Sequence, residues 1–262
     1  MSDAGLTFRL LGHGIAYSAS PAMMNTAFAE LRLPHRYVLE DVPPDDLAAA
    51  AERLRDDHAG GANVTVPHKA AAAALVDELS EDAERAGAVN VIARDGRTLL
   101  GLNTDLPATV EAIRTIAPTG VAHAVVLGAG GAGRAAELAL RDSGAERVTL
   151  LRRSDGSMDR LAENLAEADL LVNATPVGTA SDESPVDAGH LRPDLAVIDL
   201  VYRPSPTRLV RDARAAGAPA VAGAGILLGQ AWRSLELWLS VPAPVEAMRR
   251  ALRAELGDGA DA

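Results

Sequence analysis

A lysine and an aspartate stand where each could take part in proton transfer. Lys69 ends the run N-V-T-V-P-H-K over residues 63–69, in the first turn of a predicted helix, where a cation opposes the helix macrodipole. Asp105 ends the run G-L-N-T-D over residues 101–105, directly before another predicted helix. Paired with the lysine, this carboxylate could keep the ammonium charged and share a proton with a substrate hydroxyl. The alternatives are an exposed lysine and an aspartate that only caps its helix.

Two serines precede the first predicted helix. Ser18 and Ser20 belong to the run S-A-S-P over residues 18–21. Ser20 is a natural N-cap and Pro21 a natural first helical residue, so capping alone could explain Ser20. Capping does not require Ser18. Two hydroxyls beside free helix N–H groups would also suit an anion such as a substrate carboxylate.

A glycine-rich run indicates a nucleotide site. Gly128, Gly130 and Gly133 fit the pattern G-x-G-x-x-G, and the run lies between a predicted strand and a predicted helix. There the glycines allow a tight turn, close approach to a pyrophosphate and helix packing, with the helix N-terminus facing the phosphates. The alternative is a tight turn without a ligand.

Two arginines predict which dinucleotide binds. About twenty residues beyond the glycine run, NAD-binding domains place an acidic residue on the ribose 2′-hydroxyl. This chain has Arg152, Arg153 and Ser154 there. Guanidinium groups favour a 2′-phosphate, so we expect NADP. The alternative is a pair of solvated arginines, and Asp155 just beyond counts against the prediction.

Composition and missing motifs exclude several classes of protein. The net charge of −11 opposes attraction to nucleic acid, so we expect a small-molecule partner. The chain has no cysteine, and its six histidines lack H-x-x-x-H or H-E-x-x-H spacing, so we expect no metal site. No G-x-S-x-G indicates a serine nucleophile. The first eight residues do not resemble a secretory signal, and no apolar stretch would cross a membrane, so we expect a cytoplasmic protein.

The elements that must position these residues indicate an α/β protein of two domains. Residues 1–105 alternate strands and helices; the predicted strands span 8–11, 37–40, 63–66, 89–93 and 98–100, and the predicted helices 21–31, 45–57 and 69–79. Residues 106–229 form a βα series with predicted helices over 106–116 and 134–143 and predicted strands over 122–127, 147–151, 170–173, 196–201 and 220–221. The C-terminal segment, residues 230–262, contains predicted helices over 230–239 and 244–256 and is expected to complete the first domain.

The second domain is expected to be a shortened Rossmann-type, doubly wound parallel sheet. Only 15 residues, between Ser154 and Ala168, separate its second strand from the next. A crossover takes at least about 10–12 residues, so only one fits there. We therefore expect five parallel strands, with the edge strand next to the second strand missing and a more open adenine pocket.

Taken together, these runs are similar to motifs of the shikimate dehydrogenase family along nearly the whole chain. Residues 18–21 with Asn25 resemble its S-x-S-P motif, and residues 63–69 resemble N-V-T-x-P-x-K. Further matches are G-A-V-N at 87–90, N-T-D at 103–105, the glycine run, N-A-T-P-V-G at 173–178 and G-I-L-L-G-Q at 225–230.

The resemblance implies an NADP-dependent enzyme that interconverts 3-dehydroshikimate and shikimate in aromatic amino acid biosynthesis. It implies Lys69 and Asp105 as the catalytic pair and an N-terminal α/β substrate domain. The implied substrate contacts are Ser18, Ser20, Asn63, Thr65, Asn90, Tyr202 and Gln230. The implied cofactor contacts are Gly128, Gly130, Gly131, Gly133, Arg152, Arg153, Asn173, Thr175, Val177 and Gly225.

Two departures and two alternatives accompany this hypothesis. Residues 152–154 read R-R-S where the family has N-R-T, and Ile226 replaces a methionine. A quinate or aminoshikimate dehydrogenase would share most motifs, although Ser20 and Thr65 favour shikimate. A non-catalytic NADP-binding sensor is the alternative from another class, and it would not need both Lys69 and Asp105. We expect a monomer or homodimer.

Overall fold

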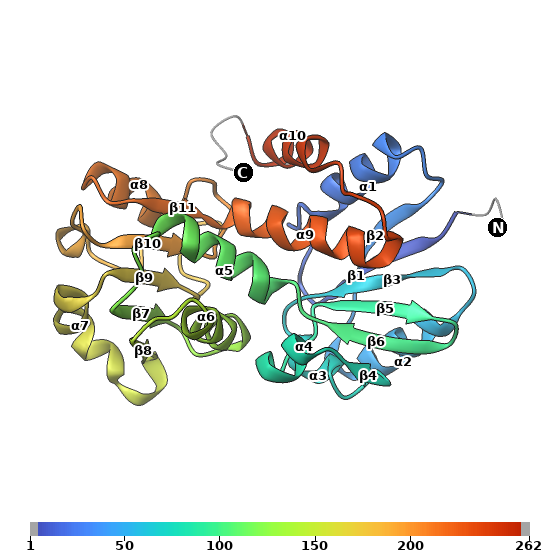
Figure 1. The fold of residues 1–262 in the computed structure, drawn as a ribbon, viewed down its shortest axis with the longest axis horizontal. Coiled ribbons are helices and arrows are strands. Elements are labelled where there is room, and N and C mark those ends of the chain that lie inside the picture. The colour runs from blue at the N-terminus through green and yellow to red at the C-terminus, as the bar shows by residue number, and fades with distance from the viewer. Residues whose placement is uncertain (1–4, 258–262) are drawn as a thin grey trace. The chain divides into compact units, whose positions relative to one another are not determined.

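The computed structural model describes residues 5–257, and the described chain divides into two compact units. One unit comprises residues 5–105 with 228–255, and the other comprises residues 106–227 with 256 and 257. Each contains a β-sheet flanked by helices, so the predicted α/β class is confirmed (Figure 1).

The sheet of the first unit is mixed. In the described residues its six strands run in the order β2-β1-β3-β5-β6-β4. They are β1 (Thr7–Gly12), β2 (Arg36–Asp41), β3 (Ala59–Val64), β4 (Glu78–Leu79), β5 (Val91–Asp95) and β6 (Thr98–Leu102). The strands β1, β2 and β3 are parallel, whereas β5 is antiparallel to both β3 and β6. A tight turn at Gly96, with φ of 59°, joins β5 to β6, as the Asp95-Gly96 pair predicts.

Helices flank this sheet (Figure 1). They are α1 (Ser20–Glu30), α2 (Leu47–Glu52), α3 (Lys69–Ala72), α4 (Glu81–Ala86), the later part of α9 (Gly223–Leu239) and α10 (Val245–Leu256). The rings of Phe8 and Trp238 lie 4.8 Å apart, and Trp238 Nε1 donates to Ile92 O at 3.1 Å. These contacts attach α9 to the sheet.

The prediction of one helix over residues 69–79 is wrong. The helix stops after Ala72, and Glu78 and Leu79 form β4 beside β6. A Cβ placed on Gly101 would lie 2.9 Å from side-chain atoms of both Val76 and Leu79, so this segment packs closely against the sheet. Tertiary packing therefore overrides the helical pattern of the alanine-rich run.

The sheet of the second unit is parallel throughout. Its five described strands run in the order β11-β10-β9-β7-β8. They are β7 (His123–Leu127), β8 (Arg147–Leu151), β9 (Leu170–Asn173), β10 (Ala196–Asp199) and β11 (Ala220–Ala222). The second strand, β8, is the edge, and one helical connection containing α7 (Leu161–Glu167) leads to β9. The predicted shortening to five strands is confirmed.

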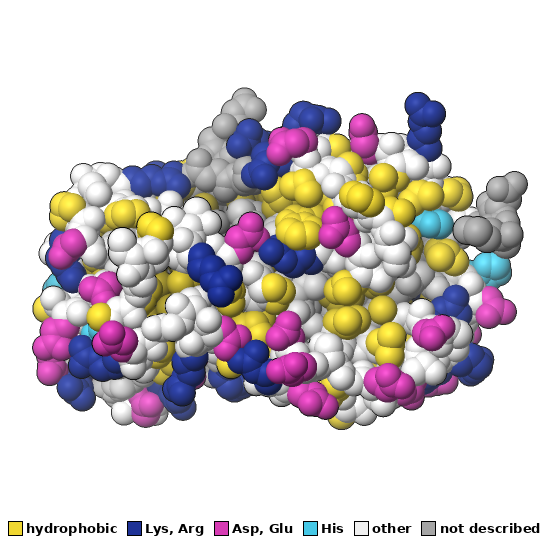
Figure 2. Space-filling model, in the orientation of Figure 1, with side chains coloured by type: hydrophobic (Ala, Val, Ile, Leu, Met, Phe, Trp, Pro, Cys, Tyr) yellow, Lys and Arg dark blue, Asp and Glu magenta, His cyan; other side chains and the backbone are white. Residues whose placement is uncertain are grey.

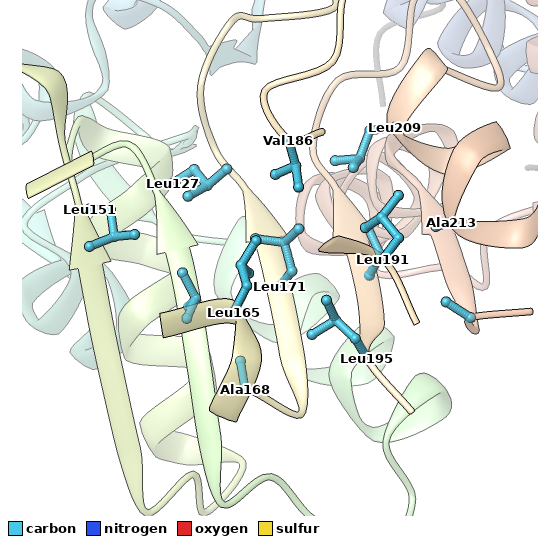
Figure 3. Packing of buried hydrophobic residues seen from close by; sticks show 13 residues of the cluster. Leu127, Leu151, Leu165, Ala168, Leu171, Val186, Leu191, Leu195, Leu209 and Ala213 are labelled. Atoms are coloured by element: carbon cyan, nitrogen blue, oxygen red, sulfur yellow. The ribbon is translucent and has the colours of Figure 1, made fainter. Parts of the chain in front are cut away.

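Two hydrophobic clusters cover the two faces of this sheet. One contains Leu127 and Leu171 from the strands and Leu165 from α7 (Figure 3). The other contains Val126 and Val172 with residues of α5 (Asp105–Ile116) and α6 (Gly131–Asp142). Successive strand residues therefore enter opposite clusters, which explains why these strands are almost wholly apolar. The remaining helix is α8 (Arg208–Ala215).

None of the helices described within residues 5–257 is long and apolar enough to span a bilayer. On the face in Figure 2, acidic and basic side chains are interspersed rather than separated by sign.

Candidate active site

The first unit joins the two residues predicted to transfer protons. Lys69 Nζ donates to Asp105 Oδ2 at 2.7 Å. The side chains are 28% and 21% exposed, so the pair is partly shielded and still reachable by a ligand. Within residues 5–257, the Lys69 ammonium has no other partner, and two of its hydrogens remain available.

Local structure fixes the position of Lys69. It is the first residue of α3, directly after His68, which is buried and donates from Nε2 to Val42 O at 2.7 Å. The carbonyl of Lys69 accepts from Val89 N at 2.8 Å. The lysine backbone is thus held from both sides, and only its flexible side chain must be oriented by Asp105.

A buried polar network lies next to this pair along the chain. Tyr37 donates its hydroxyl to Asn63 Oδ1 at 2.7 Å, and burial raises the pKa of this phenol. Asn63 Nδ2 donates to Asn90 O at 3.1 Å and to Ser234 Oγ at 3.0 Å. Both N–H groups of Asn63 are used, and Asn63 is only 5% exposed. Its amide therefore supports the site from within.

The hydrogen directions in this network can be assigned one after another. Ser234 donates its single hydroxyl hydrogen to Gln230 O at 2.8 Å, so Thr104 must be the donor in their 3.3 Å contact. Thr104 Oγ1 accepts from Asn90 Nδ2 at 3.0 Å, and Thr104 N donates to Asn90 Oδ1 at 2.7 Å. The second hydrogen of Asn90 Nδ2 has no partner in the described part of the chain.

The alternative in which Ser20 only caps its helix is wrong. The N-cap of α1 is Ala19, and Ser20 is the first helical residue. It is Ser18 whose Oγ accepts from Ser20 N, at 3.3 Å. Among residues 5–257, the hydroxyls of Ser20 and Thr65 have no hydrogen-bond partner. Both are therefore available to a ligand, whereas Ser18 serves the helix end.

The second unit presents the glycine-rich run at the end of β7. Gly128 has φ of 94°, and a Cβ on Gly133 would lie 1.9 Å from Gly128 O, so both positions require glycine. A Cβ on Gly130 or Gly131 would have no neighbour within 4 Å, and no side chain caps the start of α6. An open backbone at a helix N-terminus fits a pyrophosphate.

Replacing Gly133 with alanine should destabilise the second unit, because the new methyl group overlaps a backbone oxygen that cannot turn away. We expect the free energy of unfolding to fall by about 1–3 kcal/mol or more. Gly131→Ala is the matched control, since its methyl group would point into open space. Denaturant titration of both variants tests this, and equal midpoints would contradict it.

The two arginines after β8 differ in their surroundings. Arg152 Nε lies 3.3 Å from Asp155 Oδ2. The Arg153 side chain is exposed and has no hydrogen bond or ion pair with any described residue. Only Arg153 is therefore an unpaired cation at this position.

Asn173 is buried at the end of β9, and its amide is used inside the protein. Its Oδ1 accepts from Thr175 N and Oγ1 at 3.0 and 2.7 Å, and its Nδ2 donates to Val177 O and Asp199 Oδ1 at 3.3 and 2.8 Å. All four hydrogen-bonding positions are filled, so Asn173 shapes the turn over residues 173–178. The resemblance implies a cofactor contact at Asn173, and a hydrogen bond from its side-chain amide to the cofactor would require breaking one of these bonds.

Asp199 was not among the predicted site residues. It is 1% exposed and also accepts from Val201 N at 3.0 Å and Thr207 Oγ1 at 2.6 Å. Burial raises the pKa of this carboxyl. It joins the turn of Asn173 to the segment carrying Tyr202, which is itself half-buried. An aspartate at the end of an apolar strand was the available signal.

One further signal in the sequence was missed. Lys69 is the only lysine in the chain, and every other residue among its 25 lysines and arginines is arginine. Arginine supplies charge but does not release its proton in proteins, whereas lysine can. A single lysine in a chain that uses arginine everywhere else was therefore an available signal for a position that needs a releasable proton.

Two further predicted site residues, Gly225 and Gln230, lie on α9, and Gln230 is buried.

Comparisons with known proteins give a consistent result. Residues 10–92 match the family described as "Shikimate dehydrogenase substrate binding domain", and residues 223–253 match "Shikimate 5'-dehydrogenase C-terminal domain". A shikimate dehydrogenase (NADP(+)) of Methanopyrus kandleri is 42% identical over 271 residues, with 93% of each chain covered. The enzyme of that name from Halobacterium salinarum is 43% identical over 95% of this chain and 99% of its own.

Solved structures agree. Shikimate 5-dehydrogenase from Thermus thermophilus, in complex with NADP(H) and shikimate, is similar with a TM-score of 0.86 and 38% identity, covering 96% of this chain and 100% of its own. A 5-ketofructose reductase of Gluconobacter has a TM-score of 0.83 and 27% identity, covering 95% and 98%. The fold therefore also serves another carbonyl substrate. From its motifs, its two matched domains and its curated relatives, this chain belongs to the shikimate dehydrogenase family.

Proposed function

We propose that this protein is an NADP-dependent shikimate dehydrogenase, which reversibly reduces 3-dehydroshikimate to shikimate. The observation that carries the proposal is the 2.7 Å pair of Lys69 and Asp105 in a chain of this family. Absorbance of NADPH, followed with shikimate, quinate, aminoshikimate and 5-ketofructose and with NAD and NADP in turn, tests it. Faster turnover with any substrate other than shikimate would contradict it.

Proton transfer is the part of the reaction assigned to the first unit. Bound NADPH supplies the hydride to the ring carbon that carries the ketone. Lys69 donates a proton to the ketone oxygen during reduction and removes it in the reverse direction. Asp105 orients the ammonium and the substrate hydroxyl. Such acid-base catalysis contributes about 10²–10⁴-fold to the rate.

Substrate binding is assigned to groups with unused hydrogen bonds. Ser20 and Thr65 offer free hydroxyls, to the carboxylate and the ring respectively, and Asn90 offers its second N–H to a ring hydroxyl. Asn63 does not touch the substrate in this proposal; its side-chain amide donates to the backbone carbonyl of Asn90 and so holds Asn90 in place. Ser18 acts through Ser20, while Tyr202 and Gln230 keep the ring contacts that the family implies.

Cofactor binding is assigned to the second unit, which we propose as the NADP domain. The open positions of Gly130 and Gly131 and the uncapped N-terminus of α6 would hold the pyrophosphate. Arg153 would meet the 2′-phosphate, and the turn containing Thr175 and Val177 would line the ribose. A sensor without activity would not need the Lys69–Asp105 pair.

Replacing Ser20 with alanine should weaken substrate binding without destabilising α1. Its hydroxyl makes no capping bond, so we expect a stability change within about 0.5 kcal/mol. A lost hydrogen bond to a carboxylate should raise KM for shikimate by about tenfold and change kcat less. Ser18→Ala is the control, because it removes the acceptor of Ser20 N and should lower stability by about 0.5–2 kcal/mol. An unchanged KM in Ser20→Ala would remove Ser20 from the site.

A further inference from the structure

The loop after β8 places a carboxylate beside Arg152, the neighbour of the arginine that we assign to the 2′-phosphate. Asp155 Oδ2 lies 3.3 Å from Arg152 Nε, and each side chain is 49% exposed. The other oxygen, Oδ1, accepts from Ser157 N at 3.0 Å. Hydrogen bonds from Ser157 hold the pKa of Asp155 below its usual value, so the carboxyl is ionised at neutral pH.

The same serine closes the loop around Arg152. Ser157 Oγ accepts from Arg152 N at 2.8 Å and donates to Arg152 O at 3.2 Å, and the backbone reverses at Gly156 with φ of 74°. Asp155 is therefore held near Arg152 by the loop itself, before any ligand arrives. Arg153 has no such partner among residues 5–257.

We propose that Asp155 limits the preference for NADP over NAD by neutralising Arg152, so that Arg153 alone is free for a 2′-phosphate. This inference rests on the proposed function, because it assumes that the loop meets the adenosine ribose. The two arginines carry two positive charges, and Asp155 cancels one of them. The carboxylate also repels an ionised phosphate, whereas it can accept a hydrogen bond from the 2′-hydroxyl of NAD.

Asp155→Asn tests the proposal with little change to the loop. Asparagine keeps an Oδ1 atom that can accept from Ser157 N, but it removes the charge that pairs with Arg152. The probes are adenosine 2′,5′-bisphosphate and ADP, titrated calorimetrically against the purified protein. We expect the variant to bind the bisphosphate about three- to tenfold more tightly and ADP unchanged. The NADP-to-NAD ratio of kcat/KM should rise by the same factor.

A double-mutant cycle separates this mechanism from a general change of charge. Arg152→Gln should lower bisphosphate affinity in the wild type, because it leaves the Asp155 carboxylate unpaired, and it should abolish the gain in Asp155→Asn, so that the double variant binds within about twofold of the wild type. Asp159→Asn is the matched control, because it removes an exposed charge nearby that forms no ion pair with any described residue. The proposal is overturned if Asp155→Asn leaves bisphosphate affinity unchanged, or if Asp159→Asn produces the same gain.

The two levels of inference fail separately. If the wild type does not oxidise shikimate while bisphosphate affinity responds as expected, the proposed substrate is wrong and the role of Asp155 stands. If the wild type oxidises shikimate with NADP but Asp155→Asn does not tighten bisphosphate binding, the role of Asp155 is wrong and the proposed function stands.

Discussion

Lys69→Ala should lower kcat for shikimate oxidation by about 10²–10⁴-fold while leaving NADPH affinity nearly unchanged. In the proposed mechanism the lysine acts on the proton that moves in the transition state, whereas the residues that we propose to bind the cofactor lie in the other unit. Stopped-flow or steady-state kinetics give the first quantity, and titration of NADPH fluorescence gives the second. Turnover close to that of the wild type would remove Lys69 from the mechanism.

Lys69→Arg is the sharper companion to this variant. It retains a cation that can pair with Asp105, but arginine does not release its proton at accessible pH. If charge alone were needed, Lys69→Arg would be nearly as active as the wild type; if proton transfer is needed, it should be as impaired as Lys69→Ala. Asp105→Asn should show a similar loss, and the double variant should be little worse, because the pair acts as a unit. Additive losses would mean that the two residues work separately.

The second unit was predicted more accurately than the first, and the reason is physical. Its strands are buried on both faces, so each is a short apolar run with turn residues at its ends. In the first unit, β3 begins at Ala59 with two glycines, which have no strand propensity and were not predicted. A Cβ on Gly60 would lie 2.5 Å from the ring of Phe8, so glycine is there to let the aromatic ring approach. Such a reason exists only in the folded chain.

In the site, too, features that depend on neighbouring residues in the chain could be predicted, whereas features that depend on tertiary contacts could not. The Lys69–Asp105 pair could be predicted because each residue lies in a recognisable motif and because Lys69 is a cation at the N-terminus of a helix, where a cation is unfavourable. The internal use of Asn63 and Asn173 could not, because it depends on Ser234 and Asp199, which are 171 and 26 residues away along the chain. A motif indicates which residues belong to a site; it does not distinguish those that touch the ligand from those that hold their neighbours.

Arg153→Ala should reduce kcat/KM for NADPH by about ten- to a hundredfold and leave kcat/KM for NADH nearly unchanged. A charge-assisted hydrogen bond is worth about 1.5–3 kcal/mol, and no carboxylate of residues 5–257 pairs with the guanidinium of Arg153. Arg152 is paired with Asp155, so the double variant Arg152→Gln/Asp155→Asn, which removes this pair without changing the net charge, is the matched control.

Solvent exposure weakens the selectivity for NADPH that Arg153 provides, and the salt dependence of that selectivity shows by how much. In the described sheet no sixth strand covers β8, and both arginines are exposed. Screening by salt therefore weakens their attraction to a phosphate. At physiological ionic strength, where the screening length is about 8 Å, a phosphate in direct contact with Arg153 is still closer than that length. We therefore expect the preference for NADPH to decline only gently as salt rises. A wild-type kcat/KM for NADH equal to or above that for NADPH at moderate ionic strength would show that solvent screening outweighs the contact with Arg153 and that Arg153 does not select the cofactor.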